Sequence, residues 1–131
     1  MVIDTSALVA ILKNEPERGW FNQAIEAAER RSMSVASFVE TSMIIESRFG
    51  PEGIRALDLF IAKAAIELVP VDIDQAQIAR TAFRDYGRRR HPAGLSFGDC
   101  FAYALAKTFD EPLLYKGTDF ARTDIVAWPP S

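Results

Sequence analysis

The fold is decided first in residues 1–12, which read MVIDTSALVAIL. Met1 to Ile3 is short, apolar and rich in residues that favour strands, whereas the apolar residues from Ala7 onward recur at the spacing of a helix. Asp4 stands between the two segments, where a carboxylate can cap the first turn of the helix. This stretch therefore predicts a short buried strand that leads directly into a helix.

The same order of strand and helix recurs along the chain. Further strands are expected within 32–36, 66–71, 113–115 and 125–128, and helices within 17–31, 37–49, 52–65, 72–88 and 97–109. Strands that alternate with helices build a parallel sheet, because each parallel neighbour needs a crossover connection that a helix usually supplies. The predicted class is α/β: a three-layer α/β/α sandwich around a central, mostly parallel sheet of four or five short strands.

Composition narrows the class of protein. The chain has 131 residues, of which 49% are hydrophobic and 25% are charged, as in one folded domain. The lone Cys100 cannot form an internal disulfide, and the first residues lack a basic, cleavable leader, so a cytoplasmic protein is expected. No apolar run is long enough for a membrane span, and a net charge of −3 means that any nucleic-acid contact is local. We expect a single domain over residues 1–131 and no membrane partner.

Four acidic residues mark the expected helix starts. Asp4 follows the first strand, Glu40 and Asp99 lie in first turns of helices, and Asp119 follows the fourth expected strand. The helix that carries Asp99 returns through the short link 110–112, so it must run antiparallel to the strand that it enters. Its start then lies at the carboxyl edge of the sheet, where open α/β sheets bind ligands. All four carboxylates are therefore expected on one rim.

Capping offers a simpler role for each acid taken alone. The segments 37–40 and 96–99 have the spacing of a capping box, and the other two acids are suitable N-caps. The two roles are compatible, because helix N-termini are what bring the carboxylates together. Carboxylates grouped in a cleft of low dielectric repel one another unless a hard divalent cation neutralises them. A metal site and a set of helix caps both remain open at this point.

Four blocks of sequence resemble one family of nucleases. They are VIDTSALVAIL (2–12), SFVETSMIIE (37–46), RRRHPAGLSFGDCFAYALAK (88–107) and PLLYKGTDF (112–120). Together they are similar to the PIN-domain ribonucleases, specifically the VapC toxins of type II bacterial toxin–antitoxin pairs. The resemblance runs from Met1 to about Val126.

The resemblance implies a function, a cofactor and partners. Acids at matching positions bind Mg²⁺ or Mn²⁺ in that family, which implies metal-binding and catalytic roles for Asp4, Glu40 and Asp99, with Asp119 as the fourth member. It also implies an RNA substrate, a cognate VapB-type antitoxin that blocks the cleft, and a homodimer. The expected function is a metal-dependent endoribonuclease toxin that hydrolyses RNA phosphodiester bonds, since divalent ions can activate the attacking water and stabilise the leaving oxygen.

Other residues have candidate supporting roles. Thr5, Ser6 and Ser96 are candidates to hydrogen-bond the carboxylates or a phosphate. Trp20 and Phe21 are interpreted as helix-packing residues or as part of a groove for the antitoxin.

Basic residues approach the expected rim from the helix at 72–88. Three of them are spaced four residues apart on that helix, and the others extend the positive charge toward the rim. A solvated helix face, with arginines paired to acids such as Asp85, is the alternative. The candidate RNA-binding residues are Arg80, Arg84, Arg88, Arg89, Arg90 and Lys116.

Two functions of other classes remain as alternatives. A phosphotransfer receiver-like domain is also a parallel α/β unit with an acidic pocket, but its phosphoacceptor should follow a middle strand, and Asp58 falls inside an expected helix. A non-catalytic RNA- or partner-binding module, whose acids only cap helices, would be indifferent to metal. The response to Mg²⁺ or Mn²⁺ therefore separates this module from a nuclease.

Overall fold

The computed structural model describes residues 1–130, and its strands form a parallel four-stranded sheet. The strands are β1 (Val2–Ile3), β2 (Ser32–Ser34), β3 (Glu67–Val69) and β4 (Leu113–Leu114), in the order β3-β2-β1-β4. Every neighbouring pair in that sheet is parallel, which confirms the predicted sheet. The prediction of a strand at 125–128 is wrong, because this segment is joined to the sheet only by an isolated bridge between Ala127 and Leu113.

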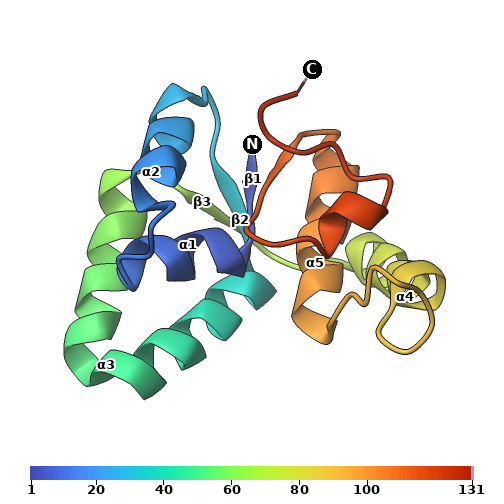
Figure 1. Cartoon of the computed structure of the whole chain (residues 1–131), viewed down its shortest axis with the longest axis horizontal. Helices are drawn as coiled ribbons and strands as arrows, with labels where there is room; N and C mark the ends of the chain where they lie inside the picture. Colours follow the sequence, from blue (N-terminus) through green and yellow to red (C-terminus); the bar gives the residue numbers. More distant parts are fainter. Residues whose placement is uncertain (131) are drawn as a thin grey trace.

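Helices cover both faces of this sheet (Figure 1). α1 (Thr5–Leu12), α2 (Arg18–Ala27) and α3 (Val35–Lys63) lie on one face, and α4 (Ile73–Tyr86) and α5 (Phe97–Phe109) lie on the other. Successive side chains of a strand point to opposite faces of the sheet and so enter the two different cores. Ile3 and Leu114 pack into the core beneath α1, α2 and α3, whereas Val2 and Leu113 pack into the core beneath α4 and α5. The predicted three-layer sandwich is confirmed.

α3 joins the two helices that were predicted at 37–49 and 52–65. They meet at Gly50, whose φ of 67° and ψ of −154° fall outside the helical range and are readily reached only without a side chain. Pro51 follows, and a proline has no backbone N–H to continue the ladder of the preceding turn. α3 therefore forms a V in Figure 1, with one arm beneath α1 and the other beside α2.

α3 also begins earlier than predicted. Ser34, at the end of β2, caps it, because its Oγ accepts a hydrogen bond from the backbone N of Ala36 at 3.2 Å. The capping box predicted between Ser37 and Glu40 is wrong, and Glu40 lies in the second turn instead of the first. A serine in extended conformation can satisfy the first free N–H groups, so the strand passes into the helix without a linker.

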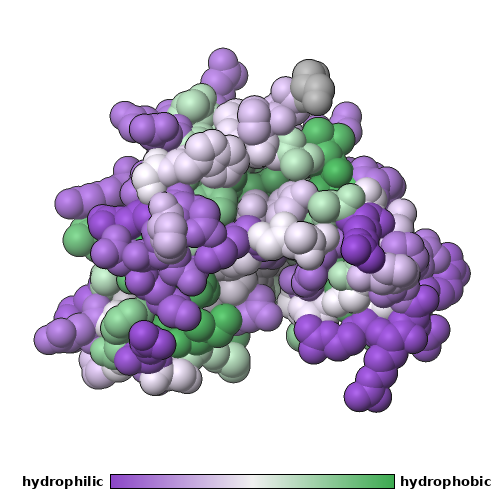
Figure 2. Space-filling view, in the orientation of Figure 1, coloured by the Kyte–Doolittle hydropathy of each residue, from purple (hydrophilic) through white to green (hydrophobic). Residues whose placement is uncertain are grey.

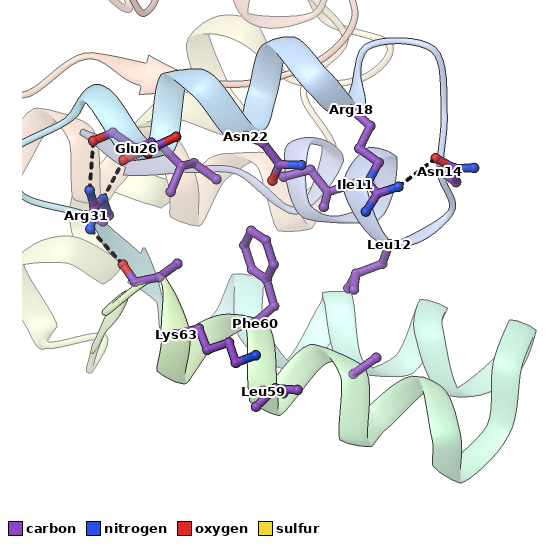
Figure 3. A pocket seen from close by; sticks show the side chains of 13 residues that line it. Ile11, Leu12, Asn14, Arg18, Asn22, Glu26, Arg31, Leu59, Phe60 and Lys63 are labelled. Carbon is purple, nitrogen blue, oxygen red and sulfur yellow. Dashed lines mark hydrogen bonds between the residues drawn. The ribbon is translucent and has the colours of Figure 1, made fainter.

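α2 ends at Ala27, earlier than the predicted Arg31. The side chain of Arg31 folds back and donates hydrogen bonds to the backbone oxygens of Ile25 and Glu26 in the last turn of α2, and to that of Ala64 at the end of α3 (Figure 3). One guanidinium thus serves the carbonyls of two helix ends that have no partner within their helices.

Trp20 does not pack into the core as interpreted from the sequence. Its side chain is 50% exposed, whereas Phe21 is 2% exposed and packs in the core between α2 and the sheet, as predicted. Neighbouring positions on a helix face different directions, so only one of the two rings can point inward. None of the helices within residues 1–130 combines the length and the apolar character needed to cross a membrane.

The kink in α3 leads to a prediction about stability. Gly50→Ala is expected to lower the free energy of unfolding by roughly 1–3 kcal/mol, because alanine is strained at this φ and ψ although open space surrounds the position. Gly19→Ala, inside α2 and also in open space, is the matched control and should be neutral or slightly stabilising. Urea unfolding of both variants measures the difference. Equal effects at the two positions would contradict the assigned strain.

Candidate metal centre

Three helix N-termini meet at the carboxyl edge of the sheet. α1 starts directly after β1 and α3 directly after β2, while α5 runs antiparallel to β4 and so begins at the same edge. In Figure 1 these starts lie together beneath the lower end of β1. Because the free N–H groups of a helix start favour negative charge, this edge suits carboxylates or a phosphate.

Asp4 is the buried acid of this edge. It is 3% exposed, and its Oδ2 accepts hydrogen bonds from the backbone N of Ser6 at 3.0 Å and from Ser6 Oγ at 2.6 Å. Its Oδ1 is buried and has no hydrogen-bond partner. Burial raises the pKa of Asp4 to about 7, the charges of Asp99 and Glu40 add to the rise, and the bonds from Ser6 oppose it. A buried carboxylate oxygen without a donor fits an oxygen-binding cation.

Asp99 is held in the first turn of α5 by the predicted capping box. Its Oδ2 accepts a hydrogen bond from the backbone N of Ser96 at 2.9 Å, and its own N donates to Ser96 Oγ at 3.2 Å. Burial raises the pKa of Asp99, the bonds to Ser96 lower it, and the charges of Asp119 and Glu40 raise it further. The charge of Asp99 therefore interacts with the charges of Glu40 and Asp119, two of the other predicted acids.

Glu40 reaches the site from α3 and lies against Gly98 of α5. A Cβ at Gly98 would overlap the carboxylate of Glu40, so with any other residue here that carboxylate would have to move away from its present position against α5. The sequence analysis did not single out Gly98. Glycine is unfavourable within a helix, so a glycine in the first turn, directly before Asp99, was the sequence signal that this position has a special role.

Asp119 is the outermost of the four acids. It is exposed and stands at the start of the 3₁₀ helix Phe120–Arg122 without a capping hydrogen bond. Its charge acts on Asp99. The structure thus confirms a capping role for Asp4 and Asp99 and shows none for Glu40 or Asp119.

The four carboxylates share a rim but do not form a closed cage. Among residues 1–130, no group of three or more His, Cys, Asp or Glu side chains is close enough to hold a metal ion together. Mg²⁺ usually takes only one or two carboxylates and keeps several waters. An open rim with one unpartnered buried oxygen therefore fits Mg²⁺ or Mn²⁺ better than an ion that requires full protein coordination.

Hydroxyl groups tie the segments of the rim together. Ser6 Oγ, which donates to Asp4, also accepts a hydrogen bond from the backbone N of Lys116 at 2.9 Å. Thr5 Oγ1 donates to the backbone oxygen of Ser37 and accepts from Thr41 Oγ1, both at 3.1 Å. Of the supporting hydroxyls proposed from the sequence, Ser6 Oγ bonds the Asp4 carboxylate as expected. Ser96 bonds the Asp99 carboxylate through its backbone N, while its Oγ accepts a hydrogen bond from the backbone N of Asp99. Thr5 instead joins α1 to α3, through Thr41, which the sequence analysis missed.

The predicted basic residues divide into two groups. The five arginines on α4 and the loop that follows it are exposed, and Figure 2 shows hydrophilic surface there, at the lower right, beside the hollow at the lower centre of this face. Arg84 pairs with its neighbour Asp85 at 3.2 Å, with both side chains largely exposed. Lys116 instead forms ion pairs with Glu15 at 3.3 Å and with Glu17 at 2.8 Å. A phosphate at Lys116 would have to compete with two acids.

Cys100 and His91 lie outside the carboxylate site. Cys100 is a core residue, and burial raises the pKa of its thiol to about 11, which keeps it protonated. His91 accepts a hydrogen bond from the backbone N of Ala93 at 3.0 Å through Nδ1, and its ring meets that of Tyr86 edge-on. This histidine is therefore tied into the loop before α5.

A separate groove of about 710 Å³ lies away from the carboxylates, between α1, α2 and the second arm of α3 (Figure 3). Leu12, Leu59 and Phe60 are among its apolar lining residues. Arg18 and Lys63 add positive charge to its rim. Trp20 is not among the lining residues, so the suggested groove role belongs to other side chains.

Comparison with known proteins identifies relatives over nearly the whole chain. The family model for the PIN domain matches residues 1–126. VapC ribonuclease Mb0640 of Mycobacterium bovis is 57% identical over 125 residues, which cover 95% of each chain. Ribonuclease VapC of Mycolicibacterium smegmatis is 55% identical over 127 residues, 97% of this chain and 98% of its own.

Solved structures share the fold at lower identity. VapC20 of Mycobacterium tuberculosis, described as a toxin that cleaves the sarcin-ricin loop, superposes with a TM-score of 0.79 at 17% identity, over 98% of both chains. A DNA-bound VapBC structure from Salmonella typhimurium gives a TM-score of 0.73 at 20% identity, over 96% of this chain and 93% of that one. These likenesses establish the same chain topology.

The raised pKa of Asp4 predicts how stability depends on pH. In the unfolded chain its carboxyl has a pKa near 3.8, and in the folded chain near 7, so the folded state binds more protons between these values. Without metal, the free energy of unfolding should therefore fall as pH rises from about 4 to about 7, with a slope of up to roughly 1.4 kcal/mol per pH unit from this group.

Urea unfolding in EDTA at several pH values measures this slope. Asp4→Asn should remove most of it and make the variant more stable than the parent chain at pH 7, because no proton is then lost at that site. Identical slopes for the two proteins would show that Asp4 does not carry the raised pKa.

Proposed function

The chain belongs to the PIN domain family, and we propose that it is a metal-dependent endoribonuclease toxin held inactive by a cognate antitoxin. The observation that carries the proposal is the buried Oδ1 of Asp4, which has no hydrogen-bond partner and lies within reach of the charges of Glu40 and Asp99. Relatives of 55% and 57% identity that are named ribonucleases support RNA as the substrate.

Asp4 and Asp99 are the residues that would hold Mg²⁺ or Mn²⁺. Their carboxylates are held from one side, by Ser6 and by Ser96, which leaves the remaining oxygens for an ion. When bound, the ion lowers the pKa of the attacking water and stabilises the charge on the leaving oxygen. Glu40, whose carboxylate lies against Gly98, would orient the attacking water, and Asp119 adds negative charge at the outer rim.

RNA approaches this rim along the exposed arginines. Arg88, Arg89 and Arg90 lie in the loop that leads into α5, so their charges precede Asp99 on the path of the chain. They provide the local positive surface that the net charge of −3 does not. Lys116 has a different role in this proposal: its ion pairs with Glu15 and Glu17 fix the segment after β4 onto the start of α2.

The groove beside α3 is the proposed docking site for a VapB-type antitoxin. Several solved structures with this fold are described as VapBC or toxin–antitoxin complexes, which supports a protein partner of that kind. The apolar floor of the groove and the cations Arg18 and Lys63 on its rim fit a helix with one apolar face and acidic flanks. The homodimer expected from the family resemblance stays a prediction.

A non-catalytic binding module is the second candidate, supported by the capping roles of Asp4 and Asp99. It differs from the nuclease in its response to metal. The receiver-like alternative is weaker, because Asp58 is exposed on the second arm of α3 and does not follow a strand.

Cleavage of RNA tests the nuclease directly. The chain, purified free of antitoxin, should cut structured RNA with Mg²⁺ or Mn²⁺ and not in EDTA. Asp4→Asn and Asp99→Asn should each slow cleavage by about 100-fold or more, the effect of losing several kcal/mol of charge stabilisation. Asp58→Asn removes an exposed acid of α3 and is the matched control. Cleavage that survives both site substitutions overturns the metal-nuclease proposal, and RNA binding that ignores metal favours the binding module.

A charge placed in the groove tests the docking site. Leu59 is 54% exposed, so Leu59→Glu should leave the fold intact yet weaken antitoxin binding at least about 10-fold, because an apolar contact is replaced by an unpaired charge. Ile73→Glu, at a position 73% exposed on α4, is the matched control. Calorimetric titration with the cognate antitoxin measures the affinity. Equal binding by both variants would exclude this groove.

A further inference from the structure

An apolar hollow lies beside the carboxylate rim and has no part in metal binding. It has a volume of about 420 Å³, lies between α4 and α5, and is lined by Phe83, Phe97 and Phe101 together with Arg80 and small side chains. The lining residues Phe97 and Cys100 stand on either side of Gly98 and Asp99 in the first turn of α5. The hollow and the proposed metal ligand thus share one helical turn.

Phe97 is the unusual residue of this hollow. Its side chain is 79% exposed, although burying a phenylalanine side chain is typically worth about 1.5–3 kcal/mol. Its ring meets the ring of Phe101 edge-on, with 4.9 Å between the centroids, so one face of the aromatic pair stays open to solvent. A flat ligand could cover this face without moving the backbone.

The charge around the hollow indicates what kind of ligand fits. Arg80 lines it, and the guanidinium of Arg90 lies 5.5 Å from the centroid of the Phe83 ring. Aromatic rings combined with arginines suit single-stranded nucleic acid, since bases stack on the rings and the cations bind the backbone phosphates.

A second copy of this chain fits the same face poorly. A twofold contact uses the same patch on both copies, so it would bring two patches that each carry Arg80 and Arg90 against one another. Like charges brought together in this way oppose association. The nucleobase is therefore the better occupant.

We propose that Phe97, with Phe83 and Phe101, stacks one unpaired nucleobase next to the phosphodiester at the carboxylate rim, while Arg80 and Arg90 bind the flanking phosphates. This inference rests on the proposed function for the identity of the substrate. It makes Phe97 a determinant of where in a strand the nuclease cuts, because cleavage then requires a base that can leave its own stack.

Binding of a short single-stranded RNA carrying 2-aminopurine tests the stacking site, with EDTA present so that no cleavage occurs. Stacking should quench the fluorescence of the parent complex. Phe97→Ala should abolish the quenching and raise Kd about 5- to 100-fold. Phe97→Trp, which keeps a stacking surface, should retain both. Phe49→Ala removes a partly exposed phenylalanine of α3 and is the matched control.

An RNA that lacks this base provides a second arm. The parent protein should bind the RNA without this base as weakly as Phe97→Ala binds the complete RNA. With the RNA that lacks the base, Phe97→Ala should not raise Kd any further. A parent chain that cleaves RNA while Phe97→Ala binds and quenches like the parent overturns the stacking site and leaves the nuclease intact. A change of sedimentation from dimer to monomer in Phe97→Ala, with unchanged RNA affinity, also overturns it in favour of a second copy. A parent chain that neither binds nor cuts RNA overturns both proposals.

Discussion

A carboxylate buried at the end of the first strand is the constraint on which the site depends. Asp4 is held where β1 passes into α1, its backbone N donates to Leu114 of β4 at 3.0 Å, and its side chain cannot leave without breaking the cap of α1. Burial of an ionised group with an unsatisfied oxygen is costly in a folded protein. The same position is therefore unfavourable for the metal-free chain and suited to a cation.

The surrounding contacts fix the carboxylate without neutralising it. Ser6 Oγ bonds Asp4 and the segment after β4, and the hydroxyls of Thr5 and Thr41 connect the starts of α1 and α3. None of these groups brings a positive charge. The nearby Lys116 is turned toward Glu15 and Glu17. The rim consequently keeps a net negative field, which favours a cation over an anion. The exposed arginines of α4 and of the loop after it lie on a different segment of the chain from these acids.

Much of this arrangement followed from the sequence alone. Alternating strands and helices gave the sandwich, and chain direction placed Asp4 and Asp99 at one edge, because parallel strands end together. The end of β2 was harder to locate, since Ser34 and Ser37 are equally good caps and only packing decides between them. The openness of the rim was also hidden, because distances between carboxylates depend on how closely α3 and α5 approach at Gly98. The ion pairs of Lys116 were hidden for a similar reason, because its partners Glu15 and Glu17 are about a hundred positions away in the sequence.

The clamp made by Arg31 has a consequence for recognition. Since one guanidinium bonds the ends of both α2 and α3, the two walls of the groove between them are joined at a set width. A rigid groove loses little conformational freedom when it is filled, and it adapts little to a poorly fitting guest. Such stiffness favours a guest whose shape already matches the groove and penalises one that needs a wider or narrower opening.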